Sequence, residues 1–129
     1  MALSTDNSVR RTLSLDAGWL HHAGEVDALL PNTHIAAYMV TKAGYARGAA
    51  RPGFDDSLWR TVDVPHDASI EQPFDPAHHI SNGYLPRGVH WYRRHFALDK
   101  SMRMGSVALR FDGVEGHCTV YLNGHLVHR

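Results

Sequence analysis

The sequence has little of what stabilises small secreted proteins, because Cys118 is its single cysteine and no internal disulfide can form. Residues 1–7 also lack the apolar core of a secretory signal. No run approaches the ~20 apolar residues that span a bilayer. These absences exclude a disulfide scaffold and a membrane-spanning helix, and they favour a cytoplasmic location.

No charge of either sign is in excess, since thirteen basic and thirteen acidic side chains give a formal net charge of zero. A nucleic-acid or membrane-surface partner is therefore not expected. The length of 129 residues allows one domain at most, and the 43% hydrophobic content is typical of a folded globular protein.

The eleven histidines show no metal-binding spacing. His21 and His22 are adjacent, as are His78 and His79, so neither pair has the i, i+4 spacing of a helical zinc site. We predict surface and loop histidines, no metal and no cofactor. Cys118 lies on the apolar face of a predicted strand and is expected to be a small core residue, not a nucleophile.

Alternation of apolar and polar residues predicts β-strands near the end of the chain. Residues 106–112 and 117–122 both alternate, and Asn123 with Gly124 separates the second run from a return strand at 125–128. Both turn residues tolerate a positive φ, which favours a two-residue hairpin. Phe111 is expected in the core.

Further strands are predicted at 11–16, 61–64 and 90–98, with Pro65 ending the second of these. Residues 21–53 indicate a long loop with a short strand near 35–40. Asp55 or Asp56 is expected to cap a helical turn that folds Leu58 and Trp59 into the core. Trp19 is a further expected core anchor. The pattern as a whole is all-β.

Four motifs follow one another along the chain. They are a first strand ending in Asp-Ala-Gly-Trp19, the run Trp59-Arg-Thr-Val-Asp-Val-Pro-His-Asp67, the run Gly83-Tyr-Leu-Pro-Arg-Gly-Val-His-Trp-Tyr-Arg93, and Phe111-Asp-Gly-Val114 with Val120-Tyr-Leu-Asn-Gly124. In this order they resemble the N-terminal sugar-binding domain of family 2 glycoside hydrolases, most like the bacterial β-galactosidase branch. Two departures are Ala68, where that family often has tryptophan, and Arg87 with His90, where it often has small residues.

The resemblance implies a jelly-roll β-sandwich of the galactose-binding-domain-like kind over residues 11–129, preceded by a flexible segment at 1–10. A family jelly roll continues through further strands, so we expect this one to be incomplete at its C-terminus. The resemblance also implies partner domains, an immunoglobulin-like sandwich and a (β/α)8 barrel, in a parent enzyme that acts on β-galactosides and can form homo-oligomers.

We expect this chain to carry no catalytic residues. Retaining glycoside hydrolysis needs two carboxyl groups ~5–5.5 Å apart. Glu25, Glu71 and Glu115 are widely separated along the chain, and Glu115 suits a solvated turn. Asp55 and Asp56 are adjacent, so their side chains point apart and a helix cap explains them better.

The loop 65–90 is the predicted place for carbohydrate contact. Aromatic rings stack on sugar C–H surfaces, and planar polar groups pair with sugar hydroxyls. Asp67 is alternatively a loop residue bonded to backbone amides, and Trp91 alternatively a core residue. An independent carbohydrate-binding module and a structural docking domain are alternatives for the whole chain. The candidate substrate-binding residues are Asp67, Tyr84, Arg87, Gly88, Val89 and Trp91.

Overall fold

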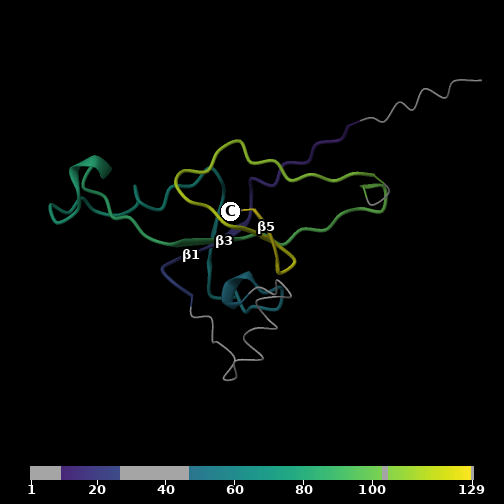
Figure 1. Ribbon diagram of the computed structural model, residues 1–129, viewed down its shortest axis with the longest axis horizontal. Helices are drawn as coiled ribbons and strands as arrows, with labels where there is room; N and C mark the ends of the chain where they lie inside the picture. Colours follow the sequence, from purple (N-terminus) through teal and green to yellow (C-terminus); the bar gives the residue numbers. More distant parts are fainter. Residues whose placement is uncertain (1–9, 27–46, 103–104, 129) are drawn as a thin grey trace, which may run out of the picture.

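The computed structural model describes residues 10–26, 47–102 and 105–128 and shows an all-β chain (Figure 1). Two short antiparallel sheets are joined by long irregular segments, and the only helical elements among these residues are single 3-10 turns, η1 (Gly48–Ala50) and η2 (Ile80–Asn82). Within the described part, no helix is long and apolar enough to cross a membrane. The all-β prediction is confirmed, and the jelly roll stays a prediction.

The first sheet has the order β2–β1–β3, with all strands antiparallel. Its central strand β1 (Trp19–Ala23) pairs with β2 (Arg60–Val62) on one side and β3 (His90–Arg93) on the other. His21 therefore lies directly opposite Arg60 on β2 and Tyr92 on β3. Because side chains alternate across a strand, these three share one face of the sheet.

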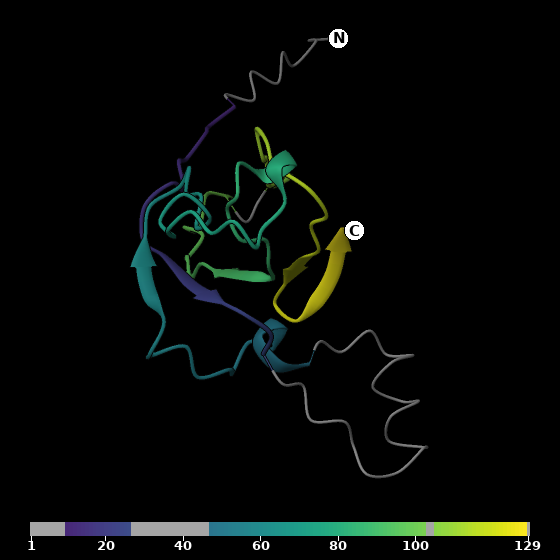
Figure 2. The same cartoon turned by 90° about the vertical axis from the view of Figure 1, so that its left-hand side faces the viewer.

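The second sheet is the hairpin β4 (Val120–Leu122) and β5 (His125–His128). Its turn residues have positive φ angles, 51° at Asn123 and 82° at Gly124, as the sequence predicts. Gly124 is buried, and a Cβ placed on it would lie 2.9 Å from Cδ of Pro52. In Figure 2 the turn of this hairpin lies next to η1, so the close approach links the second sheet to segment 48–52.

A largely buried ion pair ties β3 to the segment that precedes β2. Arg93 Nε donates to Asp56 Oδ2 at 2.7 Å, and the two side chains are only 12% and 16% exposed. The same guanidinium donates to the carbonyl oxygens of Ala49 and Arg51 and lies over the Phe54 ring. Although burial acts to raise the pKa of Asp56, hydrogen bonds with Arg93 and His95 lower it.

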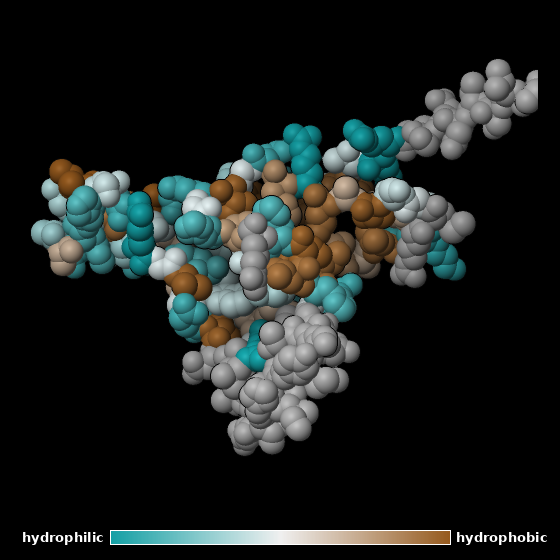
Figure 3. Space-filling view, viewed as in Figure 1, coloured by the Kyte–Doolittle hydropathy of each residue, from teal (hydrophilic) through white to brown (hydrophobic). Residues whose placement is uncertain are grey.

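The apolar core of the described residues is small, since its buried apolar side chains are Ala49, Ala50 and Ala68. The prediction that Phe111 is core is wrong, because its side chain is 49% exposed. Leu58 is 97% exposed, so the turn at 55–59 folds only Trp59 partly inward. Figure 3 shows hydrophobic surface gathered on the side where residues 105–116 lie. The exposed apolar side chains there are Val107, Leu109, Phe111 and Val114.

Several predicted strands are shorter than expected or are not formed. Residues 106–112 pair with no described strand, because alternation makes a strand only where a neighbouring backbone supplies hydrogen bonds. Residues 11–16 precede the first ladder, which starts at Trp19 after Gly18 turns the chain at a φ of 73°. Of the strands predicted at 90–98 and 117–122, only the shorter strands β3 and β4 are formed. The strand near 35–40 lies outside the described residues.

Gly124 offers the first test of this arrangement. A left-handed φ costs a side-chain-bearing residue about 1–2 kcal/mol, and the Cβ of Gly124→Ala must also displace the rigid Pro52 ring. We expect a loss of about 2 kcal/mol in the free energy of unfolding, measured by urea denaturation. Gly116→Ala is the matched control, because Gly116 has a similar φ of 77° but its Cβ would meet no atom within 4 Å. Equal stability of the two variants would contradict the hairpin contact.

Candidate functional site

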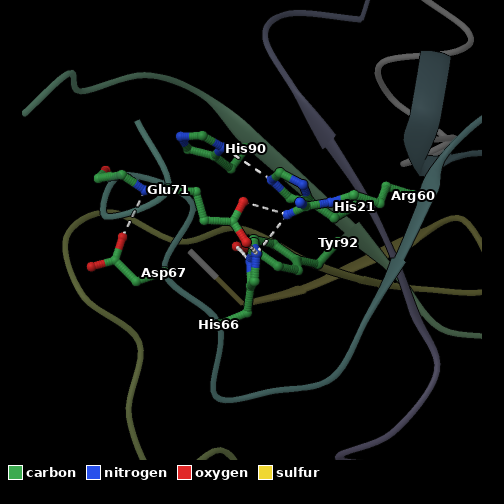
Figure 4. Close-up of polar contacts among 8 residues, drawn as sticks. His21, Arg60, His66, Asp67, Glu71, His90 and Tyr92 are labelled. Carbon is green, nitrogen blue, oxygen red and sulfur yellow. Dashed lines mark hydrogen bonds and ion pairs between the residues drawn. The ribbon is translucent and has the colours of Figure 1, made fainter. Parts of the chain in front are cut away.

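A polar cluster covers one face of the three-stranded sheet (Figure 4). Its members come from all three strands and from the loop that follows β2, and they are joined by hydrogen bonds, ion pairs and ring contacts. We call this the histidine cluster, and it consists of His21, Arg60, His66, Glu71, His90 and Tyr92.

His21 is the centre of the histidine cluster and is only 7% exposed. Its Nε2 lies 3.1 Å from Nδ1 of His90, so one imidazole donates a hydrogen bond to the other. The His21 ring centroid is 4.8 Å from that of His66 and 4.9 Å from that of Tyr92. The register that sets His21 opposite Tyr92 and Arg60 produces this arrangement.

The loop after β2 is attached to the sheet through Glu71 and His66. Glu71 Oε2 accepts a hydrogen bond from Arg60, and Glu71 Oε1 lies 3.2 Å from His66 Nε2. His66 Nδ1 is 2.7 Å from the hydroxyl oxygen of Tyr92, which connects the loop to β3. In Figure 4 the Glu71 carboxylate lies between Arg60 and His66. Both of its oxygens are therefore engaged.

Burial and neighbouring charges shift the protonation of this cluster. Burial, followed by repulsion from His66, His90 and Arg60, lowers the pKa of His21 from 6.5 to about 4. The hydrogen bond from Arg60, with a further one involving His66, lowers the pKa of Glu71. Burial raises the pKa of the Tyr92 hydroxyl. At neutral pH, Glu71 is charged and His21 is not.

A cavity of about 340 Å³ opens beside the histidine cluster. The described residues contain no group of three or more His, Cys, Asp or Glu side chains arranged to hold a metal ion. The cavity combines a tryptophan with donors and acceptors, which suits a polar organic ligand. Its lining residues are His21, His22, Ala23, Leu58, Trp59, Arg60, Ala68, Glu71, Gln72 and His90.

The predicted loop residues Asp67 and Tyr84 lie at different places on the segment 65–89. Asp67 Oδ1 accepts a hydrogen bond from the backbone N–H of Ser69 at 2.8 Å. This is the alternative given for Asp67 above, a loop residue bonded to backbone amides. Tyr84 lies at the tip of the segment with a φ of 60° and a side chain that is 41% exposed. Such a φ is unfavourable for a bulky residue, so the surrounding structure must hold it.

The other predicted residues lie where the loop returns to the sheet. Arg87 and Gly88 are exposed, and the Val89 carbonyl accepts a hydrogen bond from Gly24 N–H at 2.8 Å. Trp91 is half-buried and follows His90 on β3, so its side chain lies on the opposite face of the sheet. Trp91, on the sheet, and Tyr84, on the segment 65–89, both stay predicted stacking residues.

Backbone hydrogen bonds hold the projecting tip of this segment in one shape, at the far left in Figure 1. Asp75 N–H donates to the Tyr84 carbonyl at 3.0 Å, and Tyr84 N–H donates to the His79 carbonyl at 3.3 Å. A largely apolar hollow of about 390 Å³ is thereby formed at the tip. We call it the tip hollow, and it is lined by Phe74, Pro76, Gly83 and Tyr84.

Sequence reasoning missed the histidine cluster, since it compared only histidines that are near in sequence. His21 and His90 are 69 residues apart and meet because β1 pairs with β3. The expectation of surface histidines is wrong for His21, which is buried. The sequence did contain one signal, because Gly18 and Gly24 flank the run Trp19-Leu-His-His-Ala23. In the structure both glycines have a positive φ and the run between them is the strand β1.

The lowered pKa of His21 predicts an acid-sensitive fold. Below pH 6.5 the unfolded chain binds a proton at His21 that the folded chain does not. The free energy of unfolding therefore decreases as the pH is lowered from 6.5 to about 4. At about 1.4 kcal/mol per pH unit, we expect a loss of about 3 kcal/mol across this window, measured by urea denaturation. His21→Leu should flatten the profile, whereas His117→Gln, at an exposed position, should not. Parallel profiles for all three proteins would refute the assignment.

Comparison with known proteins finds similarity to carbohydrate-processing enzymes. A β-galactosidase from Bacteroides ovatus is 42% identical over 78 residues, which cover 59% of this chain and 9% of the relative. A β-galactosidase from Thermoanaerobacter pseudethanolicus is 36% identical over 74 residues, covering 57% of this chain and 9% of the relative. A β-glucuronidase from Formosa agariphila is 34% identical over 74 residues, which cover 55% of this chain and 8% of the relative.

No protein-family model matches the chain, and no solved structure matches it. The chain spans less than a tenth of the length of these relatives. Over more than half of its length, this chain is thus homologous to β-galactosidases and β-glucuronidases, as the resemblance to family 2 glycoside hydrolases predicts.

Proposed function

We propose that this chain is the non-catalytic, N-terminal jelly-roll region of a retaining β-galactosidase-type glycoside hydrolase. In this proposal residues 11–129 support the catalytic barrel and lend the segment 65–89 to carbohydrate binding. In the same proposal the parent enzyme hydrolyses O-glycosidic bonds in carbohydrate metabolism and acts in the cytoplasm. Cys118, the single cysteine of these 129 residues, is compatible with a reducing compartment. The similarity to β-galactosidases supports the enzyme class.

The observation that carries the carbohydrate-binding role is the ordered, projecting tip of the segment 65–89. Phe74 is 75% exposed and Tyr84 is 41% exposed beside the same apolar hollow. Exposed aromatic rings in a fixed position suit the C–H surface of a pyranose. Ordering of the tip before binding also reduces the entropy lost when a ligand is bound. Arg87, exposed at the base of the tip, is a donor for sugar hydroxyls.

The tip hollow can be tested by titrating the full chain with galactose and by measuring its binding to a glycan array. Loss of one stacked ring in Tyr84→Ala is expected to cost about 1 kcal/mol, similar to an aromatic pair, and to weaken binding roughly fivefold. Ile70→Ala is the matched control, because Ile70 is 68% exposed on the same segment but does not line the hollow. Unchanged affinity in Tyr84→Ala would remove the tip hollow as the sugar site.

A docking module is the second candidate, because exposed apolar side chains extend beyond the tip. Val107 is 49% exposed, Val114 is 55% exposed and Val127 is 54% exposed. Large exposed apolar side chains on a folded protein are candidates for an interaction site. A chain that binds no glycan on the array, and that associates with a barrel domain of the parent enzyme, would favour this second function over carbohydrate binding.

We also expect the purified chain to have no glycosidase activity. In the histidine cluster, Glu71 is already engaged by Arg60 and His66, and Glu25 and Glu115 lie on other segments. No pair of glutamates is therefore available as acid and nucleophile. Incubation with a nitrophenyl β-galactoside should release no nitrophenol above a buffer blank. Release that persists after removal of host enzymes would disprove the non-catalytic assignment.

A further inference from the structure

The cavity beside the histidine cluster has an uneven distribution of charged groups. Four of its lining side chains are cationic or can become so by taking up a proton, whereas Glu71 is the only carboxylate in the lining. Glu71 cannot supply a counter-charge to all four, because its Oε2 accepts a hydrogen bond from Arg60 and its Oε1 lies next to His66. The four basic side chains are His21, His22, Arg60 and His90.

The hydrogen-bonded pair of His21 and His90 is the part of the cavity lining where an added proton would lack a counter-charge. At neutral pH one imidazole donates to the other across 3.1 Å. A single added proton keeps this bond, because an imidazolium N–H then donates to a neutral imidazole nitrogen. The resulting charge is largely removed from water and has no carboxylate of its own, which is costly. An anion in the cavity would supply the missing counter-charge.

Other groups around the pair do not supply that charge. On the same sheet face Arg60 adds a positive charge and Tyr92 is neutral, with its hydroxyl hydrogen-bonded to His66. From the loop, Asp67 is turned to the Ser69 backbone N–H. His66 and Arg60 are therefore the bases that act on His21, and the engaged Glu71 is the acid that does so, while Asp67 acts on the neighbouring Tyr92.

We propose that this cavity binds an oxyanion, such as the carboxylate of an acidic sugar or a free carboxylate, and that binding takes up a proton at the His21–His90 pair. The negative charge lies against Arg60 and the protonated pair. Trp59, whose ring stacks on His22 with centroids 5.2 Å apart, forms an apolar wall of the site. The site is separate from the tip hollow, which shares none of its lining residues.

The test is calorimetric titration of the full chain with galacturonate, acetate and galactose at pH 5.5 and 7.5. Galacturonate affinity should be higher at pH 5.5, with an increase that cannot exceed about tenfold per pH unit for one linked proton. Acetate alone should show the same pH dependence if the carboxylate is sufficient, and none if the sugar ring is also required. Galactose, which is uncharged, should show none in either case. Equal galacturonate affinity at the two pH values would overturn the proposal.

Two further measurements separate binding from folding. His90→Gln should abolish the pH dependence, whereas His78→Gln, on the projecting segment outside the cavity, should retain it. If His90→Gln fails to fold, imidazole NMR titrations of the unaltered chain decide instead. Galacturonate should then raise the pKa of His21 above its value of about 4, and an unchanged pKa would overturn the proposal. Loss of galactose binding alone would count only against the tip hollow.

Discussion

The Arg93–Asp56 ion pair is the contact on which the described structure depends most. Its atoms are 2.7 Å apart and largely removed from water, so loss of either partner would leave an uncompensated charge. Arg93 also lies on β3 opposite Leu20 and donates to two carbonyls of the segment 49–51. One side chain thus fixes the edge of the sheet against the segment that contacts the second hairpin.

A fold with few buried apolar side chains must be specified by backbone pairing and by polar contacts. The central strand β1 supplies the pairing, and the histidine cluster supplies the polar contacts on one face. Such networks are sensitive to protonation, because each added charge must be compensated at close range. Acid sensitivity and the proposed anion site therefore have the same physical origin, namely His21 enclosed among basic neighbours.

The chain carries two surfaces of different chemistry, and the segment that follows β2 contributes to both. Near the sheet, Glu71 anchors this segment to Arg60 and borders a polar cavity. At the tip, Phe74 and Tyr84 border an apolar hollow. The anchor at Glu71 and the backbone bonds around Tyr84 hold the two surfaces in fixed positions, so substitutions can test each one separately.

The sequence alone determined the features that depend on neighbouring residues. Asn123 and Gly124 specify the hairpin turn, because few residues tolerate a positive φ. The alternation at 61–64 and the missing backbone N–H of Pro65, which ends the strand, locate β2. The ordered motifs also indicated the similarity to β-galactosidases that the comparisons with known proteins show. Only the tertiary structure decided that residues 106–112 form no ladder and that His21 meets His90. Both depend on which distant backbone lies alongside, and the sequence pattern of one segment contains no information about its partner.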